Sequence, residues 1–543
     1  MDSRKINIPG YMFYCVLVAA IGSFCNGWVI GSPNVPGDIT HNCPNGNAHI
    51  NDPRMPDCLP MNTTLWGFAV SSFCVGGLVA GISGGYIQTY LGRKKAIAVN
   101  TFGWIVGGVL MGAAVHEGMF IVGRLIAGLS CGLGSVCIPT YIGEISTIKA
   151  RGAMGTCHQF FIVIGILLAS VIGLPTATVP LWRLNFSLVG IPAIVQLFLV
   201  VTIVDSPRWL VSVNRVEDAR SALHRLRGKN ASIDAEFYEI VSAQLGPAAA
   251  ASTVSDPEFA SNPVEEEEAL HDDSATATEK IKQRSEEIHG ETQLHNREPL
   301  SLIGIFTDSL VRHITIIVLF LHFTQQWIGM NAVMFYSTII FSEAFNPDMS
   351  KYMAIATTGV NFVATLFSVI LIDRMGRRPL VMLSLAGCVI FSMLLVLGYR
   401  FQVPALLVVA VFLYVASFAI GIGPIPWMIT SELCPTYANS AVSAAATCMN
   451  WSMNFVIGLV FPIIFEEIAG YTFCIFIGVG TVAFVITYIF VPETKGRSIE
   501  KIVRDLRAST KAKKKVLPRQ APDDKEKFKE VESTQEESTT VGP

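Results

Sequence analysis

The sequence predicts an all-α membrane protein in which twelve transmembrane helices form two six-helix repeats. Two observations support this prediction. The first is composition: of 543 residues, 51% are hydrophobic and only 15% are charged, whereas soluble proteins average about 25% charged residues. The apolar residues gather in runs of ~20, which is long enough to span ~30 Å of hydrocarbon. The second is a set of short signals that occurs once in each half of the chain.

Three signals recur in the same order. Gly92-Arg93-Lys94 recurs as Gly376-Arg377-Arg378, Glu144 recurs as Glu432, and Pro207 recurs as Pro492. The distance along the chain between the two members is nearly the same for all three signals. One spacing that relates three landmarks predicts two parallel copies of one unit. In a membrane protein, such a repeat predicts a transporter whose halves rock about a central site.

The apolar runs place the twelve spans, each with approximate ends. Glycine is frequent within them, as expected where helices pack closely in lipid. The predicted spans are residues 10–32, 65–88, 96–115, 119–140, 155–175, 181–204, 313–341, 352–373, 379–399, 404–430, 441–465 and 471–491.

The spans divide the chain into two halves joined by a linker. Residues 1–205 form the first half, with an extracellular loop at 33–64, and residues 312–492 form the second half. The linker covers 206–311, and the tail covers 493–543. From about 247 to 298 the linker is rich in Ala, Ser and Glu, which cannot bury enough apolar area to order a chain. We therefore predict a disordered acidic insert there.

Basic residues orient the spans, because cytoplasmic loops carry an excess of Lys and Arg. Arg93, Lys94, Arg377 and Arg378 fall in loops of the same parity as both chain ends, so we expect both termini in the cytoplasm. The net charge of −3 gives no reason to expect a nucleic-acid partner.

The first loop carries two features that depend on the compartment it faces. Asn62-Thr63-Thr64 is an acceptor signal for glycosylation, usable if the loop is outside or lumenal. Cys43 and Cys58 are candidates for a disulfide if that compartment is oxidising, and the sequence leaves paired and free thiols equally open. No Cys/His spacing predicts a metal, and no cofactor is expected.

Ordered motifs over nearly the whole chain give a resemblance. The chain resembles the sugar-porter branch of the major facilitator superfamily, and within it the facilitative hexose transporters of animals. The resemblance excludes the predicted insert and the tail. It rests on Gly123-Arg124, Pro139–Ser146, Arg151–Gln159, Trp182-Arg183, Ser206–Arg208, Gln325–Val333, Asp373–Arg378, Gly423–Trp427, Asn450–Asn454 and Pro492–Gly496. It implies the major facilitator fold and transport of a sugar.

Charged residues at the cytoplasmic ends of the spans are predicted to form a gate. Glu144 and Glu432 each end an apolar span, and partly buried carboxylates need partners. The resemblance implies that they pair with Arg residues when the cytoplasmic side is closed, giving a latch that holds one of two states. The predicted gating residues are Arg93, Glu144, Arg151, Asp373, Arg374, Arg377 and Glu432, with Asp205 and Glu493 nearby.

Uncharged polar residues within the spans predict a sugar site. An amide both donates and accepts hydrogen bonds, as sugar hydroxyls do, and an indole can cover a sugar face. A single intramembrane amide is more simply explained by helix–helix bonding, but a cluster at positions that match the family favours sugar. The resemblance implies substrate binding by Gln159, Gln325, Gln326, Asn331, Asn361, Trp427 and Asn454.

Two differences from the family's glucose carriers bear on selectivity. Ala419 stands where those carriers often have an acid, and His322-Phe323-Thr324 replaces the Gln-Leu-Ser run associated with glucose preference. We therefore expect glucose to be carried, with selectivity broader than glucose alone.

The mode of transport is predicted from position 29. Proton-coupled relatives resemble this chain but carry an Asp there, whereas Val29 cannot take a proton. Coupling needs an ionisable group near the substrate, and His158 is the nearby candidate. We favour a uniporter over a proton–sugar symporter. A sugar-sensing receptor on the same fold is disfavoured by the short tail, and no catalytic constellation suggests an enzyme. We expect a monomer in the lipid bilayer, most simply of the plasma membrane, with an endomembrane as the alternative.

Overall fold

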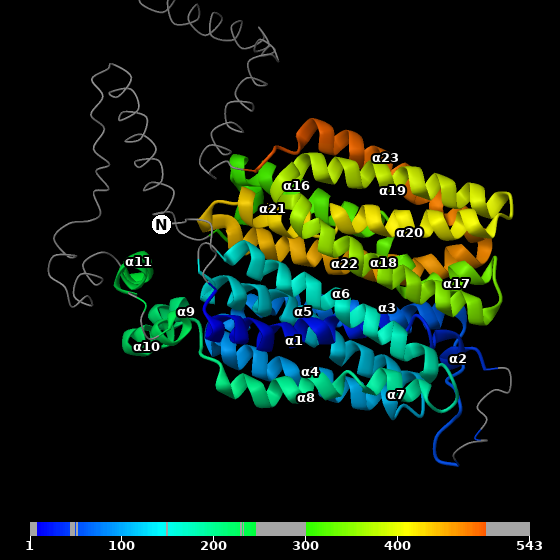
Figure 1. Cartoon of the computed structure of the whole chain (residues 1–543), viewed down its shortest axis with the longest axis horizontal. Helices are drawn as coiled ribbons and strands as arrows, with labels where there is room; N and C mark the ends of the chain where they lie inside the picture. Colours follow the sequence, from blue (N-terminus) through cyan, green and yellow to red (C-terminus); the bar gives the residue numbers. More distant parts are fainter. Residues whose placement is uncertain are drawn as a thin grey trace, which may run out of the picture.

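The structure, a computed structural model, describes residues 8–43, 49, 53–147, 150–228, 231, 233–245 and 300–495. The predicted acidic insert lies outside the described residues, as does the tail beyond Lys495. Figure 1 shows the long helices side by side in one elongated bundle, with α9, α10 and α11 beyond one end and α2 at the other.

The first half and the start of the linker are built from helices. They are α1 (Gly10–Gly31), α2 (Gly37–His41), α3 (Thr63–Leu91), α4 (Arg93–Gly112), α5 (Glu117–Ile145), α6 (Arg151–Thr176), α7 (Trp182–Ser187), α8 (Gly190–Leu199), the 3₁₀ turn η1 (Val200–Thr202), α9 (Pro207–Ser212), α10 (Val216–Arg227) and α11 (Asp234–Leu245).

The second half repeats the pattern with two interrupted spans. Its elements are α15 (Gly304–Thr307), α16 (Ser309–Trp327), α17 (Met330–Ser342), α18 (Pro347–Met375), α19 (Arg377–Arg400), α20 (Pro404–Ile420), α21 (Ile425–Leu433), α22 (Thr436–Ile468), η2 (Ala469–Thr472) and α23 (Phe473–Phe490).

The predicted twelve crossings agree with these helices. Eleven helical stretches in the described part of the chain are long and apolar enough to cross a membrane. The last, Tyr437–Phe490, contains both α22 and α23, which η2 separates. The all-helical fold class is therefore confirmed. Three predicted single spans are each divided into shorter elements: α7 with α8 and η1, α16 with α17, and α20 with α21.

The repeat extends to how helices begin. Asn62 caps α3 by accepting a hydrogen bond from the Leu65 N–H at 2.8 Å. Asn346, the matching position of the second half, caps α18 by accepting from the Met349 N–H at 2.9 Å. An Asn oxygen before a helix satisfies one of its unpaired N–H groups. The two caps therefore mark equivalent starts of the second helix in each half.

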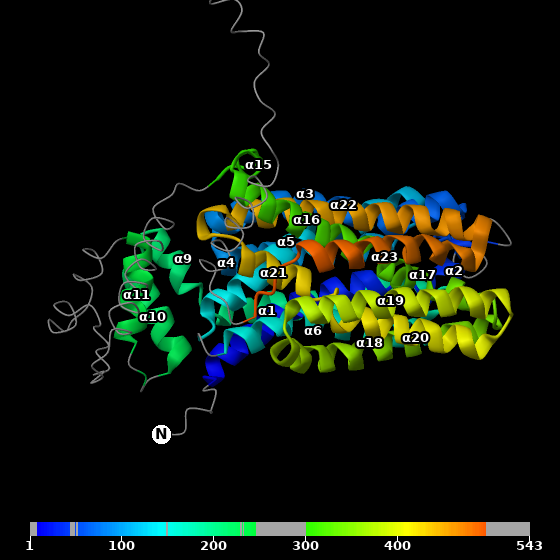
Figure 2. The same cartoon turned by 90° about the horizontal axis from the view of Figure 1, so that it is seen from above.

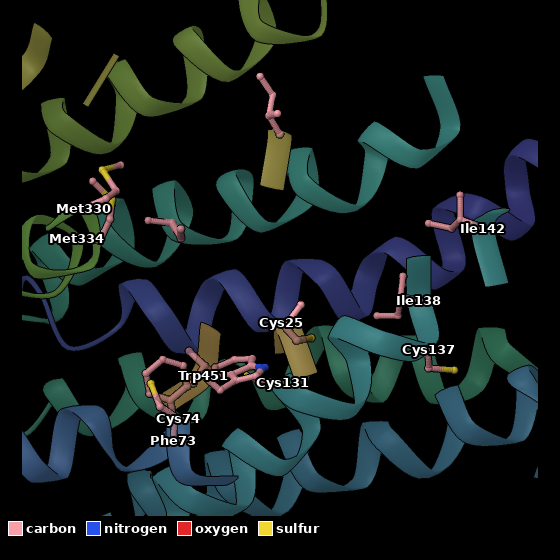
Figure 3. Close-up of a cluster of buried hydrophobic side chains, with 14 of the residues drawn as sticks. Cys25, Phe73, Cys74, Cys131, Cys137, Ile138, Ile142, Met330, Met334 and Trp451 are labelled. Carbon is pink, nitrogen blue, oxygen red and sulfur yellow. The ribbon is translucent and has the colours of Figure 1, made fainter. Parts of the chain in front are cut away.

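The halves meet along two pairs of helices, α3 with α22 and α6 with α18 (Figure 2). In the first pair, Trp451 of α22 packs edge-on against Phe73 of α3, with ring centroids 5.8 Å apart (Figure 3). Gly77 of α3 leaves room for this indole, because a Cβ there would lie 2.6 Å from a Trp451 ring carbon. In the second pair, the rings of Phe160 and Phe362 lie 5.5 Å apart.

Candidate functional site

The repeated Gly-Arg signal forms the same structure in both halves. Gly92 precedes α4 with φ 86° and ψ 161°, and Gly376 precedes α19 with φ 93° and ψ 169°. This region of backbone space is accessible essentially to glycine alone. The glycine therefore sets the sharp turn between two consecutive transmembrane helices.

A carboxylate covers each of these turns. Asp205 accepts hydrogen bonds from the backbone N–H groups of Arg93 and Lys94 at 3.1 and 3.2 Å. Glu493 accepts from the N–H groups of Arg377 and Arg378, both at 3.0 Å. Unpaired N–H groups at a helix start attract anions. We call each glycine with its carboxylate, Gly92 with Asp205 and Gly376 with Glu493, the glycine–carboxylate motif.

The Glu493 carboxylate is held in its charged form. Burial by itself would raise the pKa of Glu493, but N–H donation from Lys495, Arg377, Arg378 and Thr494 outweighs it and lowers the pKa. A group with a lowered folded-state pKa stabilises the protein above its unfolded-state pKa and loses that effect as pH falls through the folded-state value. The Glu493 carboxylate therefore makes its full contribution to stability at neutral pH.

One predicted landmark of the repeat is corrected by these contacts. The sequence comparison paired Pro207 with Pro492. The equivalent residues are the carboxylates Asp205 and Glu493, which cover the same turn in the two halves. Sequence similarity was misleading here because Pro207 follows its carboxylate, whereas Pro492 precedes its own.

Each half also pairs its repeated Arg with its repeated Glu. The Arg93 Nη2 lies 2.8 Å from the Glu144 Oε1, and the Arg377 Nη2 lies 2.9 Å from the Glu432 Oε1. Thr494 donates a further bond of 2.5 Å to the other Glu432 oxygen. Both ion pairs are largely buried and lie within one half rather than across the two.

The structure describes the remaining predicted gating residues only in part. Arg151 begins α6 and Asp373 lies near the end of α18, but their side chains lie outside the described part of the chain. The Arg374 side chain is exposed, and its backbone carbonyl accepts a bond of 2.6 Å from the Lys495 ammonium. The latch role of all these residues stays a prediction.

Replacing Glu432→Gln tests the role of the second ion pair. We expect turnover to fall about fivefold with unchanged half-saturation for sugar, because about 1 kcal/mol of charge attraction to Arg377 is lost. The measurement is the initial transport rate per folded transporter across a range of sugar concentrations. Glu466→Gln, at an exposed glutamate of α22, is the control. Wild-type turnover in Glu432→Gln would show that the pair has no part in gating.

At the opposite end of the bundle, hydrogen bonds join the two halves. Asn34, just after α1, donates to the Ser337 hydroxyl at 2.7 Å. Its side-chain oxygen accepts from the Thr338 N–H at 3.2 Å, and its backbone carbonyl accepts from the Thr338 hydroxyl at 3.0 Å. Asn34 is buried, and both partners lie on α17. This end is the extracellular one by the predicted orientation, so the bonds of Asn34 join the two halves on that side.

A buried polar cluster lies between α16, α21 and α22. Asn450 donates to the Gln325 side-chain oxygen at 2.6 Å and lies 3.3 Å from His322 Nδ1. The other His322 ring nitrogen lies 3.2 Å from the Thr430 hydroxyl. Gln325 also donates to the Gly423 carbonyl at the break between α20 and α21. We call Gln325, His322, Thr430 and Asn450 the central polar cluster.

The other predicted sugar contacts lie around this cluster. Asn331 donates to the Gln326 side-chain oxygen across the turn that Gly329 makes, with φ 95°, between α16 and α17. Asn454 lies one turn after Asn450 on α22, and its buried side-chain oxygen has no partner among the described residues. A buried acceptor without a partner is costly, which distinguishes Asn454 from its bonded neighbour Asn450.

Trp427 and two amides complete the predicted set. The Trp427 side chain is 38% exposed, and the His322 ring packs edge-on against it at 4.6 Å between centroids. Gln159 on α6 and Asn361 on α18 each directly precede a ring of the Phe160–Phe362 contact between the halves. That contact brings the two amides to facing helices, while a shared role in sugar binding stays a prediction.

Sequence reasoning missed two residues of the central polar cluster and one residue that joins the halves. Thr430 and Asn34 were not singled out, because a Thr inside an apolar span and an Asn in a loop carry no distinguishing signal. His322 was noted as a difference from glucose carriers, but its position was not foreseen. It is fully buried behind Trp427 and supports the exposed indole.

The backbone carbonyl of Val29 contacts a buried positive charge. Arg124 of α5 is fully buried, and its guanidinium donates to the Val29 carbonyl at 2.6 Å and to the Val70 carbonyl at 2.5 Å. The same guanidinium lies 4.7 Å above the Phe73 ring. Backbone carbonyls and an aromatic face thus surround a charge that would otherwise be costly in a membrane.

The first loop is anchored to the first half. The structure joins Cys43 to Cys58, with Cα atoms 6.0 Å apart. The Trp182 indole donates to the Asp57 carbonyl at 2.8 Å, and Arg183 donates to the Pro56 carbonyl at 2.7 Å. The predicted glycosylation site, Asn62, is exposed while it caps α3, and its modification stays a prediction. The described residues contain no group of three or more His, Cys, Asp or Glu that could hold a metal.

Comparisons with known proteins decide the family. The family model described as "Sugar (and other) transporter" matches residues 15–261 and 259–506. The chain belongs to this sugar transporter family. The mouse protein "Solute carrier family 2, facilitated glucose transporter member 4" is 35% identical over 516 residues, which cover 92% of each chain. The dog "facilitated glucose transporter member 3" is 32% identical and covers 93% of this chain and 94% of its own length.

Solved structures agree on the fold. The "proton:xylose symporter XylE bound to 6-bromo-6-deoxy-D-glucose" superposes with a TM-score of 0.68 at 23% identity, covering 91% of this chain and 99% of that one. The "partially occluded inward open conformation" of XylE from E. coli superposes with a TM-score of 0.65. The sugar transporter is therefore a multi-pass membrane protein with the major facilitator fold, and its relatives are transporters rather than enzymes.

Proposed function

We propose that this sugar transporter carries glucose and related hexoses down their gradients by alternating access, without proton coupling. Support for hexose comes from the chemistry of the predicted site. Amides, hydroxyls and one exposed indole offer uncharged donors, acceptors and an apolar face, which suit a neutral sugar. The relatives named as facilitated glucose transporters favour glucose within that class. We expect the transporter to work as a monomer in the bilayer of the plasma membrane.

The observation that favours uniport is the surroundings of Arg124. In this chain the Arg124 guanidinium is satisfied by the Val29 and Val70 carbonyls, which take no proton. A carboxylate at position 29 would instead give Arg124 a partner whose charge changes on protonation. His158, the candidate for coupling, shares a 2.7 Å hydrogen bond with Ser23 inside the first half. That bond links the His158 imidazole of α6 to α1 within the first half.

Counterflow tests the proposed substrate. Purified transporter in proteoliposomes preloaded with unlabelled glucose should take up labelled glucose transiently above its external concentration. Adding an external hexose that is also a substrate should compete with this uptake, and a panel of hexoses ranks the preference. Loss of counterflow with every hexose tested, while the protein remains folded, would refute hexose transport.

Replacing Val29→Asp tests the role of position 29. We expect uptake to become pH-dependent, slow at neutral pH and faster as pH falls. The ionised carboxylate would bind Arg124 and hold the first half in one arrangement, and protonation would release it. The measurement is the initial uptake rate with equal pH on both sides of the membrane. Val29→Asn, which has the same shape without the charge, should stay insensitive to pH. A pH response of equal size in both variants would contradict this account.

A further inference from the structure

The break between α20 and α21 leaves backbone groups without their usual helical partners. In a continuous helix, Gly421 N–H would donate to the Ser417 carbonyl, but it turns instead to Phe418 at 3.3 Å. Gly423 N–H also donates to the Phe418 carbonyl, at 3.0 Å, and so takes the usual acceptor of the Ile422 N–H. Within a membrane such groups must be satisfied by the protein.

One side chain of α19 hydrogen-bonds both to the end of α20 and to the segment between α20 and α21. The Ser384 hydroxyl donates to the Ser417 carbonyl at 2.6 Å and accepts from the Ile422 N–H at 3.0 Å. Ser384 is 1% exposed, so water does not compete for these bonds. A hydroxyl carries one donor and two acceptor sites, which is the set needed here. Ser384 thus bridges the end of α20 and the segment that leads into α21.

Two further side chains hold the same segment. Pro424 has no N–H to give the Ile420 carbonyl, and the Ser368 hydroxyl of α18 donates to that carbonyl at 3.0 Å instead. Gln325 of α16 donates to the Gly423 carbonyl. A Cβ at Gly421 would lie 2.5 Å from the Ser384 Cβ, so α19 and the break are in direct contact. Proline breaks helices by these missing bonds, and these side chains replace them.

The two helices on either side of the break belong to different packing groups. α20 packs along α19, whereas α21 packs mainly against α16 and α22, which carry members of the central polar cluster, and touches α19 less extensively. A hinge between two such groups absorbs backbone rotation when one moves relative to the other. Ser384 lies on α19, which packs with α20. Its hydroxyl accepts from the Ile422 N–H, in the segment that leads to α21.

We propose that Ser384 is a positioning residue that serves as the pivot on which α21 turns during the transport cycle. The proposal rests on alternating access, which is part of the proposed function. In this proposal, the Ser384 hydroxyl keeps its hydrogen bonds to the Ser417 carbonyl and the Ile422 N–H while α21 moves. The Ser384 hydroxyl contacts backbone atoms of the break and no predicted sugar contact, so its effect is expected on turnover rather than on sugar binding.

Replacing Ser384→Ala tests the pivot. We expect turnover per folded transporter to fall about tenfold. The variant leaves a buried backbone group without its hydrogen-bond partner, and a loss of that kind corresponds to about a tenfold change in rate. Half-saturation for glucose should stay unchanged, because no predicted sugar contact is removed. Hydrogen–deuterium exchange of the peptide that contains Ile422 should also become faster. Ser392→Ala is the matched control, since Ser392 is equally buried but lies farther along α19, away from the residues that contact the break.

The outcomes separate this proposal from the proposed function. Wild-type turnover in Ser384→Ala, or a raised half-saturation with unchanged turnover, would overturn the pivot while leaving hexose transport standing. Wild-type protein without transport would refute the proposed function, whereas exchange at Ile422 would still report on the Ser384 bond. If Ser384→Ala does not fold, Ser368→Ala removes one donor from the same break. The pivot then predicts a smaller fall in turnover, and unchanged turnover would overturn it.

Discussion

Transport of glucose should fall about a hundredfold when Gln325→Ala and Asn331→Ala are combined. Each amide offers a sugar hydroxyl about 1 kcal/mol or more of net hydrogen bonding, so each loss is worth up to about tenfold. Gln325 also binds Asn450 and the Gly423 carbonyl, so its loss leaves both groups without this partner. The measurement is counterflow per folded transporter, together with glucose binding to purified protein.

A matched control separates loss of the site from loss of the fold. Asn100→Ala removes a buried amide from α4, which takes no part in the predicted sugar site. We expect near wild-type counterflow in that variant. If the double variant binds and transports glucose as the wild type does, the site lies elsewhere.

Replacing Gly376→Ala should destabilise the second glycine–carboxylate motif by about 1–3 kcal/mol, the cost of a non-glycine residue in a glycine-only region. The Gly376 backbone has φ 93° and ψ 169°, and an added Cβ would lie 2.9 Å from a Glu493 carboxylate oxygen. The carboxylate must then move away from the N–H groups of Arg377 and Arg378 that it covers. We expect a lower melting temperature in detergent and a fall in turnover.

Gly478→Ala provides the control for this variant. Gly478 lies within α23, and a Cβ there would meet nothing within 4 Å. Alanine is the better helix former, so the melting temperature should hold or rise. An equal melting temperature in Gly376→Ala and wild type would contradict the strain assigned to this turn. Gly92→Ala should repeat the effect, because a Cβ there would lie 2.7 Å from an Asp205 oxygen.

The fold could be predicted from sequence because its determinants are local or repeated. Apolar runs reveal spans without any knowledge of contacts, since every span must satisfy its own backbone in lipid. The repeat was also visible, since Gly92 and Gly376 are required by the same turn. The third landmark was wrong, because the prolines near Asp205 and Glu493 are not equivalent and only the hydrogen bonds identify the carboxylates.

The residue types of the site could be predicted from sequence, but the hydrogen-bond partners of these residues could not. Amides within apolar spans are conspicuous, which is why Gln325 and Asn331 could be proposed. Their partners could not be inferred, because the bond between Gln325 and Asn450 joins residues 125 positions apart. Ser384 and Thr430 carry no signal at all in a sequence, since a serine or threonine in a membrane helix commonly bonds to its own helix. Only tertiary contacts distinguish a residue that bonds across helices.

The structure also changes how the two ends of the bundle are understood. The predicted latch rested on ion pairs at the cytoplasmic end, yet the described pairs there lie within each half. Among the described residues, hydrogen bonds between Asn34 and α17 join the halves at the other end. The role of the Arg–Glu pairs in gating therefore stays a prediction, and the Glu432→Gln variant tests it.

The most direct test of the central account is glucose uptake under an imposed proton gradient. Proteoliposomes with equal glucose on both sides are given an acidic exterior, and the internal labelled glucose is followed over time. A facilitative carrier predicts that internal and external glucose stay equal, while a glucose gradient at equal pH drives uptake. Accumulation of glucose above the external concentration, abolished by a protonophore, would contradict uniport and establish proton coupling.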